Sequence, residues 1–272
     1  MKPTMTLDRV LSRFGLASRN AAREAILAGR MKVNGRTMRD PDVWVSPDRD
    51  AFQLDGRRLK PVRKRYLLFY KPKGVITSHG DPAGRETIYQ YLGGLAPPLR
   101  AARAGLKPGA TEENEWVAPV GRLDKDTSGL LLLSNDTEFA DLITNPESGI
   151  RKTYLVKLNA LASDEVIARL SAGVEMKRGD FARPISVRRR EDRGQYTWLE
   201  VVLTEGKNRE VRRMIEAVGF KVLKLVRTHI GPLTLDGLEV GKCRALTAAE
   251  IAALWNAGSK GHWAESSNRY QV

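Results

Sequence analysis

The sequence predicts an α+β protein with two folded parts, a small N-terminal module and a larger, mainly antiparallel domain. In the first sixty residues, helix-capping side chains precede two short amphipathic segments, and two hairpin dipeptides follow them. Farther along, predicted strands outnumber predicted helices and do not alternate regularly with them. This order argues against a parallel sheet built from crossover helices.

The N-terminal module is predicted to contain two helices and two hairpins within residues 5–60. Thr6 is placed to cap a first helix that ends at Gly15. Ser18 is placed to cap a second helix that runs to residue 28 and ends at Gly29. The hairpins are predicted at two turn dipeptides, Asn34-Gly35 after residues 31–33 and Asp55-Gly56 after residues 52–54.

Positive charge is concentrated at this end of the chain. The 272 residues include 46 Lys and Arg against 32 Asp and Glu, a net charge of +14, and residues 1–65 alone carry +9 from 16 basic and 7 acidic side chains. Such a balance favours a polyanionic partner. Nucleic acid is favoured over a membrane because no basic amphipathic anchor or long apolar segment accompanies the charge. Five side chains on or just after the second helix are candidates for RNA-phosphate contacts: Arg19, Arg23, Arg30, Lys32 and Arg36.

A basic, proline-containing run separates the module from the second domain. We expect a linker at residues 61–65, a domain at 66–256 and a disordered tail at 257–272. Within the domain, residues 93–115 are rich in Gly, Pro and Ala and predict a flexible insertion. Strands are expected at residues 66–70, 130–133, 152–158, 185–188 and 197–203, and helices at 86–92, 138–144 and 248–255.

The most informative segment is a charged loop directly before four consecutive leucines. An apolar run bounded by Gly129 and the Asn135-Asp136 turn predicts a buried strand, so the preceding loop lies where the core meets the surface. A carboxylate there can be fixed and partly desolvated, and Asp124 is the candidate. Taken alone, such an aspartate is more often a structural turn residue.

Residues 206–219 predict a basic helix with glycine at both ends. Its apolar stripe consists of Val211, Met214, Ile215 and Val218. At about 100° per residue, Arg212 borders this stripe, whereas Arg209 and Arg213 face solvent. A half-buried guanidinium needs a carboxylate, and Asp124 is the expected partner. A solvated basic helix face is the alternative interpretation.

Other side chains limit the chemistry that is available. Tyr154, in the middle of a predicted strand, is explained either by core packing or by stacking on an RNA base taken out of its helix. One cysteine and three scattered histidines provide no metal-ligand spacing. Neither a Walker-type loop nor a dinucleotide fingerprint is present. We therefore expect no metal or cofactor and, since no export signal opens the chain, a cytoplasmic protein.

Three of these motifs together resemble the RsuA/RluB family of ribosomal RNA pseudouridine synthases. They are Gly121-Arg122-Leu123-Asp124 with its downstream Thr-Ser-Gly-Leu-Leu-Leu-Leu, Lys152-Thr153-Tyr154, and the segment 206–214. The resemblance covers nearly the whole chain, and the N-terminal module resembles the RNA-binding domain of the S4 type. It implies a pseudouridine synthase domain with a mainly antiparallel mixed sheet, acting on a uridine in ribosomal RNA.

The resemblance also implies a role for each site residue. Asp124 would be the nucleophile, Arg212 would keep it ionised and oriented, and Tyr154 would stack on the base. Arg122, Arg209 and Arg213 would contact the substrate RNA. No cofactor or metal is implied, because the reaction adds and removes no atoms. The expected partner is ribosomal RNA or a subunit assembly intermediate, bound by a monomer without membrane contact.

Several functions remain open from the sequence. A non-catalytic ribosome-binding protein would use only the module, and a nucleoside hydrolase or RNA glycosylase would use Asp124 to release free uracil. Residues 205–213 and 217–219 are closer to the large-subunit (RluB-like) branch than to the small-subunit (RsuA-like) one. We therefore expect one uridine in a stem-loop of large-subunit (23S) RNA as the target, with small-subunit (16S) RNA as the alternative.

Overall fold

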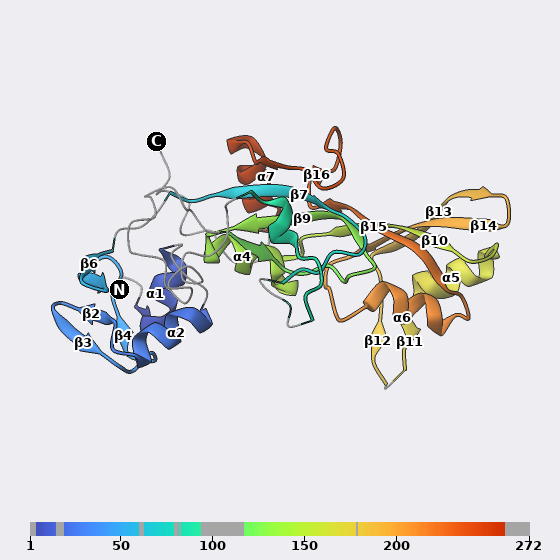
Figure 1. Cartoon of the computed structure of the whole chain (residues 1–272). Coiled ribbons are helices and arrows are strands. Elements are labelled where there is room, and N and C mark those ends of the chain that lie inside the picture. The colour runs from blue at the N-terminus through green and yellow to red at the C-terminus, as the bar shows by residue number, and fades with distance from the viewer. Residues whose placement is uncertain are drawn as a thin grey trace. The chain divides into compact units, whose positions relative to one another are not determined.

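The computed structural model describes residues 4–14, 19–59, 63–78, 81, 83–93, 117–177 and 179–258 (Figure 1). Residues 94–116 and 259–272, which hold most of the expected insertion and tail, lie outside the described residues, as does Ser18. The chain divides into two compact units. One comprises Met1–Tyr66, Leu92–Pro119 and Leu133–Glu138, and the other Leu67–Tyr91, Val120–Leu132 and Phe139–Val272.

The N-terminal module combines two helices with small antiparallel sheets. Its elements are β1 (Met5–Thr6), α1 (Leu7–Arg13), α2 (Arg19–Leu27), β2 (Met31–Val33), β3 (Arg36–Met38), β4 (Trp44–Val45), β5 (Phe52–Leu54) and β6 (Arg57–Arg58). Strands β3, β2, β5 and β6 form one sheet in that order, and β1 pairs with β4. Asn34-Gly35 and Asp55-Gly56 have positive φ at both positions, as two-residue hairpin turns require. Both predicted hairpins are confirmed.

The module closes over one apolar core to which both helices and the sheet contribute. Phe14 and Phe52 meet edge to face with ring centroids 5.7 Å apart. The other buried members are Leu7, Val10, Leu11, Ala22, Ile26, Met31, Val33 and Val45. At the start of α1, the Thr6 hydroxyl donates to the Asp8 carboxylate at 2.6 Å. Thr6 therefore precedes the helix as expected but does not cap it as an acceptor.

The second domain is built on a mixed sheet in which nine strands are described. Its order is β13-β14-β10-β15-β9-β7-β17, with β16 beside β15 and β8 beside β9. The strands are β7 (Tyr66–Lys71), β8 (Ala118–Val120), β9 (Ser128–Ser134), β10 (Lys152–Leu158), β13 (Ser186–Arg193), β14 (Tyr196–Leu203), β15 (Val222–Ile230), β16 (Leu233–Thr234) and β17 (Cys243–Ala245). A separate hairpin is formed by β11 (Val174–Glu175) and β12 (Phe181–Ala182).

Most strand pairs of this sheet are antiparallel, and β9 runs parallel to β15. The predicted α+β class with a mainly antiparallel mixed sheet is thus confirmed. The helices are η1 (Ile88–Tyr91) and η2 (Pro146–Ser148), both 3-10, and α4 (Thr137–Thr144), α5 (Asp164–Ala172), α6 (Glu210–Ala217) and α7 (Ala248–Gly258). The helix expected at 86–92 is a 3-10 turn, and α7 extends beyond the expected boundary at 256.

Helix α6 begins later than the sequence predicted. Residues 206–209 precede it, and Arg209 adopts a left-handed conformation with φ of 49°. A left-handed residue interrupts a right-handed helix, so the segment led by Gly206 is a loop. The backbone N–H of Lys207 donates to Glu210 Oε2 at 3.0 Å, which ties this loop to the first turn of α6.

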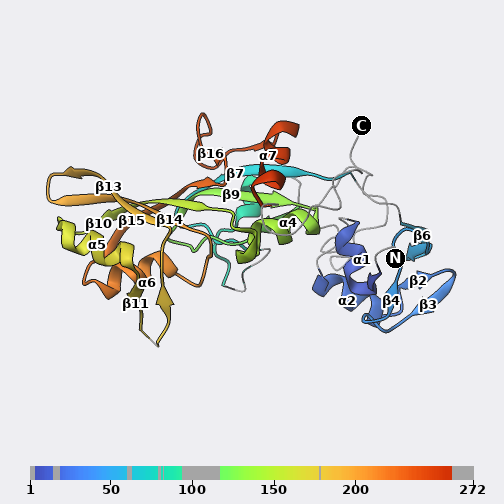
Figure 2. The same cartoon turned by 180° about the vertical axis from the view of Figure 1, so that it is seen from behind.

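Strand β15 lies between β10 and β9, and the sequence indicated only its end, at His229, and not its bounds. It pairs antiparallel with β10 and parallel with β9 at Val226–Ser128 and Arg227–Gly129. Arg227 and Tyr154 are direct Cα partners, so their side chains share one face of the sheet. At the β13–β14 end, α5 and α6 lie on the same side of the sheet in both views (Figures 1 and 2). Among the described residues, no helix is long and apolar enough to cross a membrane.

The close pairing of β9 with β15 requires glycine at position 129. A Cβ at Gly129, whose φ is +117°, would lie 2.3 Å from the backbone oxygen of Arg227 and 2.6 Å from its nitrogen. We expect Gly129→Ala to lower the unfolding free energy by roughly 3 kcal/mol or more, because backbone atoms cannot move aside as a flexible side chain does.

Urea denaturation measures this effect, with Gly206→Ala as the matched control. Gly206 has no atom within 4 Å of its Cβ position, so its change should stay within about 0.5 kcal/mol of the wild type. Equal stability of the two variants would show that β9 and β15 do not pair as described.

Candidate active site

The loop that carries Asp124 is held by backbone hydrogen bonds on both sides of that residue. Thr77 Oγ1 donates to the Leu123 carbonyl at 2.8 Å and accepts from its N–H at 3.3 Å. Gly74 N donates to the Lys125 carbonyl at 2.8 Å, and Thr127 N to that of Asp124 at 3.0 Å. The residue between β8 and β9 therefore has a fixed main chain, while its side chain is only half-buried.

Lys71, at the end of β7, supports the same loop from inside the protein. The side chain is fully buried, and its Nζ donates to the Thr127 carbonyl at 2.9 Å and to the Pro72 carbonyl at 3.0 Å. Burial lowers the pKa of Lys71 to about 8, and the negative charges of Asp124 and Asp126 oppose that shift. The sequence placed Lys71 at a strand end and gave it no role.

Arg212 reaches the loop from α6, but it does not pair with Asp124. Its Nη2 donates to the Asp126 carbonyl at 2.9 Å and its Nη1 to the Val222 carbonyl at 3.3 Å. The predicted ion pair does not form, because the guanidinium donates to main-chain carbonyls instead. Burial lowers the pKa of Arg212, as does the charge of Arg209, while Asp126 and Asp124 act in the opposite direction. Arg212 Nε is buried without a hydrogen-bond partner.

These contacts leave the Asp124 carboxylate available. Within the parts of the chain that the structure describes, it forms no ion pair and no hydrogen bond. Arg122, two residues earlier, is exposed beside it. Two buried cations, Lys71 and Arg212, contribute a positive field while bonding to the backbone. A carboxylate held in this way can act on a substrate without first breaking a salt bridge.

The other two arginines of this helix segment differ from each other. Arg209 is exposed, as predicted. Arg213 was also expected to face solvent, but its Nη2 donates to the Lys177 carbonyl at 3.0 Å and pairs with the Asp180 carboxylate. The cause is the β11–β12 hairpin, which the sequence analysis did not predict and which lies against this side of α6.

Tyr154 lies in a row of residues that crosses the sheet toward this loop. It is 8% exposed on β10, faces Arg227 on β15, and Arg227 in turn pairs with Gly129 at the start of β9. At about 5 Å per strand, the backbones of Tyr154 and Gly129 are roughly 10 Å apart. Gly129 follows Asp124 by five residues, so the fold brings Tyr154 to the same region of the sheet as the loop.

Three further buried charges lie on the elements around Tyr154, and the sequence analysis missed all of them. Arg227 Nε donates to the Leu130 carbonyl at 2.7 Å, while its Nη2 has no partner. Lys152 Nζ donates to the Thr204 carbonyl at 2.8 Å. Burial lowers its pKa to about 8, Arg227 adds to that effect, and Glu210 opposes it. Lys152 and Glu210 lie on a predicted strand and a predicted helix, whereas Arg227 lies on β15; in none of the three did the sequence signal burial.

Glu210, the first residue of α6, is the buried carboxylate of this group. It is 3% exposed, and its Oε1 has no hydrogen-bond partner. Burial raises the pKa of Glu210 to about 7, and the neighbouring carboxylate of Glu205 adds to the shift. Among the described residues, no group of three or more His, Cys, Asp or Glu side chains is placed to hold a metal ion.

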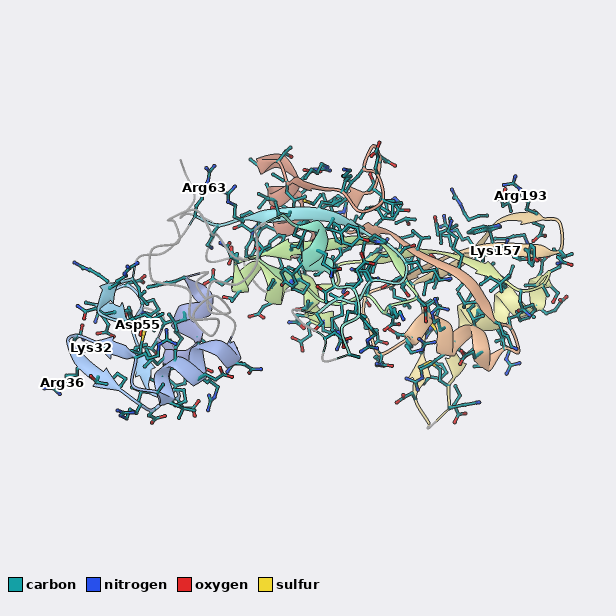
Figure 3. All side chains as sticks on the ribbon, in the orientation of Figure 1. Lys32, Arg36, Asp55, Arg63, Lys157 and Arg193 are labelled. Carbon is teal, nitrogen blue, oxygen red and sulfur yellow. The ribbon has the colours of Figure 1, made fainter. Side chains whose placement is uncertain are left out.

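In the N-terminal module, the five predicted RNA contacts fall into two classes. Arg19 and Arg23 pair with buried Asp8 at 3.0 and 3.3 Å, and Arg23 also pairs with Asp42. Arg30 pairs with Asp55. Lys32 and Arg36 instead lie exposed on the β2–β3 hairpin (Figure 3). Arg19, Arg23 and Arg30 are therefore paired with carboxylates of the module itself, whereas Lys32 and Arg36 have no such partner among the described residues.

Comparison with known proteins gives the family. A family model described as RNA pseudouridylate synthase matches residues 65–217, and one described as S4 domain matches residues 5–48. The chain belongs to the RNA pseudouridylate synthase family. The predicted family resemblance is confirmed, as are the enzyme class and the order of an S4 domain followed by a synthase domain.

Relatives of this synthase match most of its length. It is 34% identical over 249 residues to the ribosomal large subunit pseudouridine synthase B of Bacillus subtilis (strain 168), covering 91% of this chain and 94% of that one. It is 37% identical over 252 residues to an uncharacterized RNA pseudouridine synthase of Aquifex aeolicus (strain VF5), covering 92% and 94%. A crystal structure of a pseudouridylate synthase, 29% identical, superposes with a TM-score of 0.62 over 92% of this chain and 99% of that one.

The raised pKa of Glu210 predicts a pH-dependent stability of the synthase. Its folded-state pKa of about 7 exceeds the ordinary 4.5, so this group stabilises the fold fully below pH 4.5 and loses that contribution as the pH rises to 7. The loss amounts to roughly 3 kcal/mol. Glu210→Gln keeps an acceptor for Lys207 N and should remove this pH dependence of the unfolding free energy.

Urea denaturation between pH 5 and 7.5 tests this expectation and avoids the range above pH 8 in which Lys71 and Lys152 deprotonate. The control is Glu216→Gln, which changes an exposed carboxylate on the same helix. That variant should follow the wild-type curve. If the unfolding free energy of Glu210→Gln changed with pH in parallel with that of the wild type, Glu210 would not be buried as described.

Proposed function

We propose that this enzyme converts one uridine to pseudouridine in large-subunit (23S) ribosomal RNA, with Asp124 as the nucleophile. The observation that carries the proposal is the loop geometry, in which the main chain around Asp124 is fixed and its carboxylate is unpaired. Relatives named for the large ribosomal subunit support the choice of RNA.

The reaction is an exchange of one bond for another within the same nucleotide. The bond between uracil N1 and ribose C1′ breaks, the uracil turns, and a bond forms between C5 and C1′. C5 loses a proton and N1 gains one, so the composition of the RNA is unchanged. A carboxylate suits this chemistry because carboxylates form covalent intermediates in displacement reactions at sugars.

The remaining residues receive roles that fit their surroundings. Arg212 is proposed to act as a positioning residue, because it bonds to the Asp126 carbonyl of the loop and not to the Asp124 carboxylate. Tyr154 is proposed to stack on the displaced base, which has left the RNA stack to reach the enzyme. Arg122 and Arg209, both exposed, are proposed to contact phosphates. Arg213 is proposed to act indirectly, since it already pairs with Asp180.

The substrate assignment is tested by incubating the purified protein separately with protein-free large- and small-subunit rRNA and mapping pseudouridine in each. We expect a single modified position, in the large-subunit RNA. Asp124→Asn should lower the rate by at least a thousandfold, because an amide of the same shape is not a nucleophile. Asp126→Asn, in the same loop, should stay within about tenfold, because Arg212 bonds to the backbone of Asp126 and not to its carboxylate.

Each outcome points to a different error. Modification of small-subunit RNA alone would reject the choice of RNA and keep the chemistry. Residual activity of Asp124→Asn near the wild-type rate would reject the nucleophile. Release of free uracil would indicate cleavage of the glycosidic bond instead of isomerisation.

The two classes of cation in the S4 domain predict two kinds of defect. Lys32→Gln combined with Arg36→Gln should weaken binding to ribosomal RNA. It should also make the negative slope of log affinity against log salt shallower by roughly 1.5 to 2, because two phosphate contacts are lost. Its unfolding free energy should remain within about 0.5 kcal/mol of the wild type.

The contrasting variant is Arg19→Gln, which removes one of the two cations that pair with buried Asp8. This variant should lower the unfolding free energy of the module, since the Asp8 carboxylate that loses a partner is fully buried. The slope of log affinity against log salt should stay close to that of the wild type. Equal salt slopes for the wild type and the Lys32/Arg36 variant would show that the β2–β3 hairpin does not touch RNA.

A further inference from the structure

One face of the large sheet is without a covering helix at its β13–β14 end. Helices α5 and α6 lie on one side of the sheet there, and in both views no described helix lies on the other (Figures 1 and 2). Alternation along β14 assigns its residues to the two sides, because Thr197, Leu199 and Val201 are buried while Tyr196 and Trp198 are partly exposed. Tyr196 and Trp198 therefore belong to the uncovered side.

Basic residues gather around these two rings. On β10, Lys157 is the Cα partner of Trp198, and on β15, Lys224 is the Cα partner of Lys157. On β13, Arg193 is opposite Tyr196. Lys157 and Arg193 lie at this end of the sheet in Figure 3. We call this surface the basic sheet face, and its members are Lys157, Arg188, Arg190, Arg193, Tyr196, Trp198 and Lys224.

The aromatic rings hold the lysine side chains in place. The ammonium of Lys157 lies 4.0 Å from the centroid of the Tyr196 ring and 5.8 Å from that of Trp198, and the ammonium of Lys224 lies 5.9 Å from the Trp198 centroid. Cation–π attraction offsets the repulsion between two like charges on neighbouring strands. It also restricts side chains that would otherwise be mobile, so an incoming anion meets charges that are already positioned.

The charge of the basic sheet face is not neutralised by the protein. Its five cations face only two carboxylates at matching strand positions, Glu191 and Glu200. Arg190 approaches Glu200 at 3.8 Å. Lys157, Arg188, Arg193 and Lys224 form no ion pair with any described residue. An excess of positive charge on a solvent-accessible sheet face fits a polyanion, and this protein is proposed to bind one.

We infer that the basic sheet face binds the phosphate backbone of the substrate RNA at a place away from the target uridine. The inference rests on the proposed function for the identity of the RNA. Backbone contact fits better than base stacking, because the Tyr196 ring is already covered by an ammonium. Tyr154 belongs to the opposite, buried face of β10, so the segment bound here is not the one that enters the active site.

The test compares three pairs of substitutions in the full-length protein, using protein-free large-subunit rRNA and a series of salt concentrations. Lys157→Gln with Lys224→Gln removes two charges from the basic sheet face. Lys157→Arg with Lys224→Arg keeps both charges and their attraction to the rings. Arg169→Gln with Lys242→Gln removes two exposed charges that lie elsewhere in the same domain, on α5 and in the turn before β17.

We expect the glutamine pair on the basic sheet face to make the negative slope of log affinity against log salt shallower by roughly 1.5 to 2. Between 50 and 200 mM salt, the wild type should then lose about tenfold more affinity than this variant. The arginine pair and the Arg169/Lys242 control should keep the wild-type slope. All three variants should have a melting temperature close to that of the wild type, which shows that the fold is retained.

Two results would overturn the inference. An unchanged slope for the glutamine pair would mean that the basic sheet face does not bind RNA. A loss in the arginine pair as large as in the glutamine pair would mean that charge is not what matters. Neither result depends on catalysis. Failure of the proposed function would appear separately, as absence of pseudouridine from rRNA treated with the wild-type protein.

Discussion

The candidate active site depends on hydrogen bonds from buried cations to the main-chain carbonyls of one loop. Lys71 bonds to the carbonyl of Thr127, and Arg212 to that of Asp126. A cation that bonded directly to the Asp124 carboxylate would have to be displaced before that carboxylate could act as the proposed nucleophile. By bonding to carbonyls, these side chains fix the loop, provide a positive field and leave the carboxylate free. The cost is the burial of charge, which is why the pKa values of both cations are lowered.

Much of the fold followed from local patterns, because those patterns report short-range physics. The strand predicted at residues 152–158 is β10 with the same bounds, and the dipeptides Asn34-Gly35 and Asp55-Gly56 predicted two turns with positive φ. The bounds of strand β15 were not predicted because Lys224, Arg227 and His229 interrupt its apolar pattern. Arg227 is nevertheless buried, with its Nε bonded to a carbonyl of β9. The burial of Arg227 is tolerated because β9 supplies a carbonyl acceptor. Since β9 is distant in the sequence, no local pattern could reveal it.

The site was predicted in the same uneven way. Helical periodicity correctly placed Arg212 at the border of an apolar stripe, since that is a property of the helix alone. Its hydrogen-bond partners depend on where α6 docks, and this is set by β15 and by the β11–β12 hairpin. The same hairpin pairs with Arg213 and shields it partly from solvent. In the S4 domain, charge counting found the arginines but could not show that Asp8 and Asp55 pair with three of them.

The parallel pairing of β9 with β15 has a consequence for the order in which the protein forms. The bond from Arg227 to the Leu130 carbonyl joins residues 97 positions apart, and the bond from Arg212 to the Asp126 carbonyl joins residues 86 positions apart. Contacts of such long range form late, because a large loop must close before they stabilise anything. The strand pairs of the S4 domain close much shorter loops. During synthesis on a ribosome, the S4 domain can therefore fold well before the residues that hold the Asp124 loop have been added.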